Sequence, residues 1–307
     1  MAILGTLLVA GPAFLSSYWV GLLTEILILA MLAMSLDILL GYTGLPSLGH
    51  ASLFGVAAYA VGVFSTTYQM GFWTCVLGGI AVGVLVSAAI GLVVSHVRSV
   101  YFLMITLAIG MVLWGLSYRW IPVTGGDNGL SGIPRLELHA GLPFAGPNAF
   151  YYITLAVFAL SALAIAILVR SPFGLTLRGI RENEGRMKSL GFNTWLHCYL
   201  SFVVSGFFAS VAGIMWAYYN GFVSPTYLDL TASSELFLMV TLGGPSTLIG
   251  PVLGAGAIVL LKNVMSAYTA RWLLILGIAY IVGILAAPQG LWNLRRRSRG
   301  PGLRPGP

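Results

Sequence analysis

Apolar runs of about 20 residues recur along almost the whole sequence, and they constrain the fold more than any other feature. A helix needs about 20 apolar residues to cross a membrane, whereas barrel strands would show shorter, alternating segments. Only 7% of the residues are charged, against about 25% in soluble domains. We therefore predict an all-α polytopic membrane protein with about eight to ten membrane segments, surrounded by lipid. The apolar segments lie near residues 2–15, 19–40, 48–68, 72–95, 101–120, 151–169, 199–220, 235–262 and 272–288.

Basic residues determine the predicted orientation, because Lys and Arg accumulate in cytoplasmic loops. The loop 171–197 is rich in both and is placed in the cytoplasm, while residues 1–292 form a single transmembrane domain. The basic tail 293–307 is cytoplasmic as well if the interrupted run at 235–262 counts as an even crossing or a re-entrant element. The net charge of +7 is spread over such flanking segments, with no basic and aromatic surface of the kind that binds nucleic acid.

The loop contains the string "SPFGLTLRGIRENEGRMKSLGFN", residues 171–193, in which we predict one short helix from Thr176 to Leu190. Gly191 is well placed to end that helix. Two ion pairs with the favourable i,i+4 order would support it: Glu182 with Arg186, and Glu184 with Lys188.

A narrow apolar stripe runs along the same predicted helix, formed by Leu177, Ile180 and Met187. Periodicity alone leaves two interpretations open. The helix is either a solvated or lipid-surface connector, or a docking element whose stripe enters a groove of a soluble partner.

Several strings together resemble those of a known family. They are "SLDILLGYTG", "SLGHASLFGVAAY", "TGGDNGLSGIP", "RENEGRMKSLGFN", "SFVVSGFFASVAGIMWAYYNGFVSP" and "VTLGGPSTLIGPVLGA". In this order the chain resembles, from about residue 30 to residue 292, the bacterial inner-membrane permeases of ABC importers for branched-chain amino acids, of the type called LivM. The resemblance implies a permease subunit that works with a second, homologous permease (LivH-type), two ATPase subunits and an extracytoplasmic substrate-binding protein.

The resemblance also assigns a role to the cytoplasmic loop, as the counterpart of the helix that docks on the ATPase subunit. The positions carried over are Arg178, Arg181, Glu182, Asn183, Glu184 and Gly191. Two positions depart from the family pattern: Leu45-Pro46 stands where the family often has Gln, and Leu175 where it often has Arg. A close relative that imports urea or short-chain amides is the alternative within the family.

The sequence carries no phosphate-binding motif of the form G-x-x-x-x-G-K-[ST], so ATP hydrolysis is expected from a separate polypeptide. No His, Cys and carboxylate cluster has metal-site spacing, and Cys75 and Cys198 are expected to be free. We expect no catalytic residues, cofactor or metal. A stand-alone secondary transporter is the less favoured class, because no clear acidic pair lies at the expected membrane midplane.

Four ionisable groups fall within the predicted spans, namely Glu25, Asp37, His50 and Glu235. A charge at the centre of a bilayer costs about 2.5–3.5 kcal/mol, so each needs a partner or an interfacial position. We expect Asp37 to bond to the turn at 41–44 and His50 to tie down a turn. Glu25 and Glu235 are expected at the outer interface.

Gly and Pro interrupt two apolar segments, one in each half of the chain: "GYTGLPSLGHASLFG" and "LGGPSTLIGPVLGAG". Transporters commonly have related halves, and paired interruptions are the best pointer to a transport path in such a sequence. One interpretation is a surface turn at 41–47 and a packing kink at Gly243. The other is that both breaks flank a path at the interface with the second permease, shaped by Gly44, Ser47, Gly49, His50, Gly243, Gly244 and Thr247.

Overall fold

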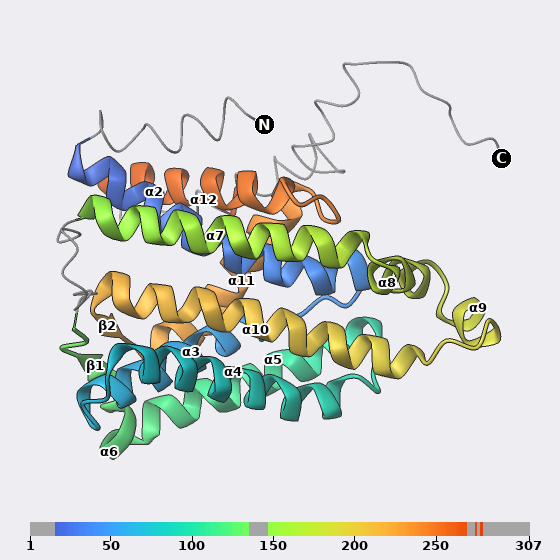
Figure 1. Ribbon diagram of the computed structural model, residues 1–307, viewed down its shortest axis with the longest axis horizontal. Helices are drawn as coiled ribbons and strands as arrows, with labels where there is room; N and C mark the ends of the chain where they lie inside the picture. The colour runs from blue at the N-terminus through green and yellow to red at the C-terminus, as the bar shows by residue number, and fades with distance from the viewer. Residues whose placement is uncertain (1–15, 135–146, 269–273, 275–276, 279–307) are drawn as a thin grey trace.

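The computed structural model describes residues 16–134, 147–268, 274, 277 and 278. These residues form a bundle of long helices whose axes run in roughly the same direction (Figure 1). The expected segment at 2–15, almost all of 272–288 and the tail 293–307 lie outside the described residues.

Six helices in the described part of the chain are long and apolar enough to cross a membrane. They are α2 (Ser17–Asp37) continued by the π-helical turn η1 (Ile38–Thr43), α4 (Phe72–Val94), α5 (Ser99–Arg119), α7 (Pro147–Arg170), α10 (Thr194–Asn220) and α12 (Gly250–Tyr268). Two shorter apolar helices, α3 (His50–Thr66) and α11 (Leu230–Gly243), complete the bundle. The all-α polytopic class is therefore confirmed, and six full-length spans are found in the described residues.

The short elements gather at the two ends of the bundle (Figure 1). At one end lie α8 (Pro172–Glu182) and α9 (Glu184–Ser189). At the other lie α6 (Ile121–Thr124), η2 (Gly126–Asn128), η3 (Pro225–Leu228) and a two-residue antiparallel pairing of β1 (Leu130–Ser131) with β2 (Phe222–Val223). We call these the α8–α9 end and the β1–β2 end.

The interrupted segment near 235–262 could have been one long broken helix or two short ones, and the structure shows two helices that form a hairpin. α11 runs toward the α8–α9 end and α12 returns from it. Glycines allow the two to cross closely: a Cβ on Gly254 would lie 1.8 Å from the carbonyl oxygen of Met239, and one on Gly243 would lie 2.0 Å from that of Gly250.

The first interruption enters the bundle instead of remaining at its end. η1 ends at Gly44, which has φ +76°, and α3 begins only at His50. Gly49 lies against the middle of α5, where a Cβ would come 2.0 Å from the carbonyl oxygen of Thr106. Ser47 is buried. The interpretation of 41–47 as a surface turn is therefore wrong, since residues 41–43 still belong to η1 and residues 44–49 carry non-helical backbone to the depth of the spans. Such backbone must be enclosed by protein, as it is here.

α10 forms the centre of the packing and contacts α2, α3 and α4. Small residues allow the close approach: a Cβ on Gly213 would meet the carbonyl oxygen of Phe54 at 2.1 Å, and one on Gly206 would meet the Ser87 side chain at 2.3 Å. The outward faces of α4 and α5 remain exposed and apolar, as expected for helices that face lipid.

Candidate functional site

The two interruptions meet at the α8–α9 end, and a side chain of α8 joins them. The Arg181 guanidinium donates hydrogen bonds to the carbonyl oxygen of Gly41 and to the hydroxyl of Ser246. The Ser246 hydroxyl in turn donates to the Gly41 carbonyl at 2.6 Å. Helix α8, the first break and the hairpin tip therefore share one hydrogen-bonded cluster, formed by Asp37, Gly41, Arg181 and Ser246.

Backbone geometry brings Ser246 to this position. Gly244 has φ +108° and Ser246 has φ +65°, so the hairpin tip turns sharply on both sides of Pro245. At the opposing surface Gly41 leaves no room for a side chain, because a Cβ there would lie 2.0 Å from Asp37 Oδ1 and 2.4 Å from the Ser246 nitrogen. Glycine at 41 is thus required for the close contact between the two breaks.

Asp37 was expected to bond to the turn at 41–44, and that prediction is wrong. Its Oδ1 accepts from the backbone N–H of Ser246 at 2.8 Å, in the other half of the chain. The carboxylate is buried, and Arg181 is the positive charge acting on it. A buried carboxylate needs such compensation, and here the loop supplies it.

α8 makes a second contact with the first break. The Arg178 guanidinium carbon lies 5.1 Å from the ring centroid of Tyr42 in η1, within the range of a cation–π interaction. Gly44 lies beneath the same helix, where an added Cβ would be 2.8 Å from Cγ of Arg181. Helix α8 is therefore in direct contact with η1 and with the residue that follows it.

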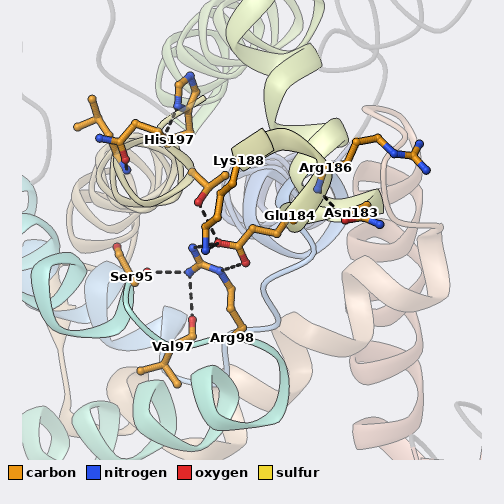
Figure 2. Close-up of polar contacts among 12 residues, drawn as sticks. Ser95, Val97, Arg98, Asn183, Glu184, Arg186, Lys188 and His197 are labelled. Carbon is orange, nitrogen blue, oxygen red and sulfur yellow. Dashed lines mark hydrogen bonds and ion pairs between the residues drawn. The ribbon is translucent and has the colours of Figure 1, made fainter. Parts of the chain in front are cut away.

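A second cluster fixes α9 to the bundle (Figure 2). Glu184 accepts from Arg98 Nε at 2.8 Å and from Arg98 Nη2 at 3.1 Å, a two-point contact between α9 and the start of α5. Lys188 Nζ lies 3.1 Å from Glu184 Oε1, and Thr194 Oγ1 donates to that oxygen at 2.9 Å. The hydrogen bonds from Arg98 are the main reason that the pKa of Glu184 is lowered to about 2.

The predicted single helix from Thr176 to Leu190 is wrong, because Asn183 divides it in two. Asn183 has an extended backbone and caps α9 by accepting from the N–H of Arg186 at 2.9 Å. The expected ion pair between Glu182 and Arg186 is not among the ion pairs of the described residues, whereas the pair of Glu184 with Lys188 is confirmed. Gly191 has φ +87° just beyond α9 and is confirmed as its stop.

The predicted docking stripe of Leu177, Ile180 and Met187 packs toward the core of this chain, so it is not available to a partner. Leu177 is 1% exposed and Ile180 is 6% exposed, so both belong to this chain's own core. Apolar side chains that do project from the loop include Leu175, Leu190 and Phe192, which are 61%, 66% and 42% exposed. α9 itself contains no buried residue.

The remaining residues of the predicted transport path lie at two different depths in the bundle. Gly243, Gly244 and Thr247 belong to the hairpin tip near Ser246, where the Thr247 hydroxyl donates to the Gly244 carbonyl at 2.7 Å. Ser47, Gly49 and His50 lie deeper, in the run that enters the bundle. The ring of His50 is buried with Nε2 2.9 Å from Ser35 Oγ, so it ties α3 to α2 and not to a turn.

Sequence reasoning did not identify Ser246 and Arg98 as members of these clusters. Ser246 follows Gly-Gly-Pro, a pattern typical of a turn, but the turn residue alone does not name its partner. Arg98 is an isolated basic residue between two apolar runs. Within the described residues, no group of three or more His, Cys, Asp or Glu side chains could hold a metal ion.

Several known transport permeases are similar to this chain in sequence. The family model described as "Branched-chain amino acid transport system / permease component" matches residues 18–285. The LivM permease protein of Salmonella typhimurium is 30% identical, over 94% of this chain and 73% of its own length. The LivH permease protein of the same species is 24% identical over 78% of this chain and 82% of its own. The autoinducer 2 import permease LsrC of an Enterobacter strain is 28% identical over 100% of this chain and 90% of its own.

Proposed function

Because the chain belongs to the branched-chain amino acid transport permease family and is a permease subunit of an ABC importer, we propose that α8 and α9 couple it to separate ATPase subunits. The main support for this proposal is that a single side chain, Arg181, contacts both interruptions of the bundle. A soluble subunit that moves α8 therefore moves both breaks together.

The outward surface of the loop has the character of a docking site. Leu175, Leu190 and Phe192 project from it beyond the spans, and polar Glu182 and Asn183 lie between them. Exposed apolar side chains rimmed by polar ones are typical of protein interaction sites. Glu184 and Gly191 act within the loop, by anchoring α9 and by ending it, while Arg178 and Arg181 transmit its position inward.

Charge distribution supports a cytoplasmic location for this end, in a multi-pass protein of the bacterial plasma membrane. Basic side chains collect in the segments at the α8–α9 end, whereas Arg119 and Lys262 lie toward the β1–β2 end. The basic residues at the first end are Arg98, Arg170, Arg178, Arg181, Arg186 and Lys188.

For the substrate we propose branched-chain or similar small apolar amino acids, delivered by an extracytoplasmic binding protein. Support comes from the names of the relatives, because LivM and LivH of Salmonella typhimurium are both named as permease proteins of a high-affinity branched-chain amino acid transport system. A second, LivH-type permease would complete the membrane unit, with the path at their interface and beside the two breaks. Import of urea or short amides is the alternative, and LsrC is named for import of a different compound, autoinducer 2.

The docking surface is tested by reversing its chemistry at one position. Leu190→Asp places a charge on the apolar surface, and we expect ATPase subunits to stop co-purifying with the permease. Ile121→Asp is the matched control, because Ile121 is 67% exposed at the opposite end while Leu190 is 66% exposed. Unchanged ATPase association with Leu190→Asp would contradict the proposal.

The energy source is tested with purified components. We expect no ATP hydrolysis by the isolated chain, and ATP-driven uptake of leucine only when both permeases, the ATPase subunits and the binding protein are present in vesicles. ATP turnover by the isolated chain would contradict the assignment of hydrolysis to partners.

A further inference from the structure

Three of the four ionisable side chains predicted within the spans have a positively charged partner. Glu235 Oε2 lies 3.1 Å from Lys262 Nζ, and Glu25 interacts with the same lysine. Asp37 is under the influence of the guanidinium in α8, as described above. His50, at the start of α3, is different, because one of its two ring nitrogens has no partner among the described residues although the ring is buried.

The hydroxyl groups around the His50 ring determine which nitrogen carries its hydrogen. Ser35 Oγ donates to the carbonyl oxygen of Leu32 at 2.6 Å, and Ser205 Oγ donates to that of Ser35. Each hydroxyl has one hydrogen, so both can only accept from His50 Nε2, which lies 2.9 Å from Ser35 Oγ and 3.4 Å from Ser205 Oγ. In the neutral ring Nε2 is therefore the donor, and Nδ1 is an acceptor.

Nδ1 of His50 then requires a donor, and no described group supplies one. A buried acceptor without a partner has lost its hydration without compensation. A protonated ring would not solve the problem, because Nδ1–H would lack an acceptor instead. No carboxylate forms an ion pair with His50 among the described residues either, so a positive charge there would be uncompensated.

The N-terminus of α3 adds further unpaired groups close to this ring in the chain. Gly49 is the N-cap residue and has no side chain with which to cap the helix. The N–H groups of His50 and Ala51 take part in no hydrogen bond among the described residues, and both residues are buried. Ser47 is buried as well, and its Oγ has no partner there. Since nearly all buried polar groups are paired, this cluster of unpaired donors and acceptors indicates a bound molecule.

Water is the small ligand whose chemistry matches this cluster. The N–H groups need an acceptor, whereas Nδ1 of His50 needs a donor, and a water molecule is both. An anion only accepts hydrogen bonds and would leave Nδ1 unpaired. A cation would be repelled by the N–H groups, which form the positive end of the helix dipole. Buried waters make about three hydrogen bonds, usually to groups that have no other partner.

We propose that a water molecule is bound at the N-terminus of α3, donating to His50 Nδ1 and accepting from the first N–H groups of the helix, with Ser47 Oγ as a further partner. The site goes beyond the import function proposed above and does not depend on it. It places water inside the bundle at the depth of the spans, at the end of the run from Gly44 to Gly49. The unpaired groups of that run thereby gain partners without contact with lipid.

Solid-state nitrogen NMR of the full chain in lipid bilayers tests the site. Replacing His96, His139 and His197 by Gln leaves His50 as the single labelled histidine. We expect a protonated Nε2, an unprotonated Nδ1 with the chemical shift of a hydrogen-bonded acceptor, and magnetisation transfer from water to the ring. A proton on Nδ1 in addition to Nε2 would indicate an anion at the helix and overturn the proposal. So would an Nδ1 with the shift of a free acceptor and no transfer from water.

Two matched serine variants test the role of Ser47. Ser47→Ala removes one of the proposed partners of the water, and we expect the transfer from water to the His50 ring to fall by about threefold or more. Ser65→Ala is the control, because the Ser65 hydroxyl donates to the carbonyl oxygen of Gly62 within α3, and it should leave the transfer unchanged. Equal transfer in the two variants would contradict the assignment of Ser47 to the site. Uptake of substrate by the importer is not part of this measurement, so either result leaves the proposed function as it stands.

Discussion

Arg181 donates a hydrogen bond to Ser246, which lies 65 positions further along the chain and in a different interruption of the bundle. The same guanidinium reaches the Gly41 carbonyl. A helix at the surface is thus connected to two segments that would otherwise be independent of it. Coupled sites need such a physical connection, and here its members are identified residue by residue.

Removing either partner of this contact should uncouple ATP hydrolysis from transport. A hydrogen bond to a charged group contributes about 1.5–3 kcal/mol, so Arg181→Gln or Ser246→Ala should lower leucine uptake per ATP by about tenfold or more. Because both changes break one contact, the double variant should be little worse than either single one. Uptake and ATPase rates in vesicles measure the ratio, and strictly additive losses would show that the two residues act independently.

Gly41→Ala should separate the two breaks by steric conflict. The added methyl group would lie 2.0 Å from Asp37 Oδ1 and 2.4 Å from the Ser246 nitrogen, neither of which moves freely. We expect a loss of about 1–3 kcal/mol of stability, seen as a lower melting temperature in detergent. Gly115→Ala in α5 is the control, since nothing lies within 4 Å of its added carbon, and it should not lower the melting temperature. Equal melting temperatures for both variants would contradict the tight packing at Gly41.

The anchoring of α9 should depend on pH through Glu184. Its pKa falls from 4.5 to about 2 in the folded protein, chiefly through the hydrogen bonds from Arg98, so the charged form is favoured by folding. The stabilisation is therefore complete above pH 4.5 and is lost as the pH falls toward about 2. A fluorophore on Ser189→Cys should report release of α9 over that window.

Two variants identify the group responsible for this transition. Glu184→Gln should show the released signal at all pH values, while Glu182→Gln should keep the transition of the parent protein, because Glu182 is exposed. A transition that survives in Glu184→Gln would assign the pH dependence to another group.

Cysteine labelling tests whether the breaks border the path. In the resting state Ser47→Cys should resist a small water-soluble thiol reagent, because Ser47 is 1% exposed, whereas Ser131→Cys at the exposed β1–β2 end should react. During ATP turnover by the assembled importer we expect Ser47→Cys and Thr247→Cys to become reactive. The native Cys75 and Cys198 are buried and give little background. Protection of both positions in every nucleotide state would assign the breaks a structural role only.

Features that depend on residues close together in the sequence could be predicted, whereas contacts between residues far apart in the sequence could not. Helix-length apolar runs and the Gly191 stop are local patterns, and the structure confirms both. The division at Asn183 was missed because Asn favours helix caps but is also tolerated within helices. The bond from Ser246 to Asp37 joins residues 209 positions apart, and the contact of Arg98 with Glu184 spans 86. No periodicity encodes such pairs, so the two clusters required the structure.

Membrane insertion of the nascent chain is constrained by the run from Gly44 to Gly49. Its non-helical backbone is tolerated at the depth of the spans only when protein covers it, and the covering surface at Gly49 is Thr106 of α5. When α3 first leaves the ribosome, α5 has not yet been synthesised. We therefore expect α2 and α3 to remain beside the insertion machinery until α5 has been made, because only then is the backbone at Gly49 covered.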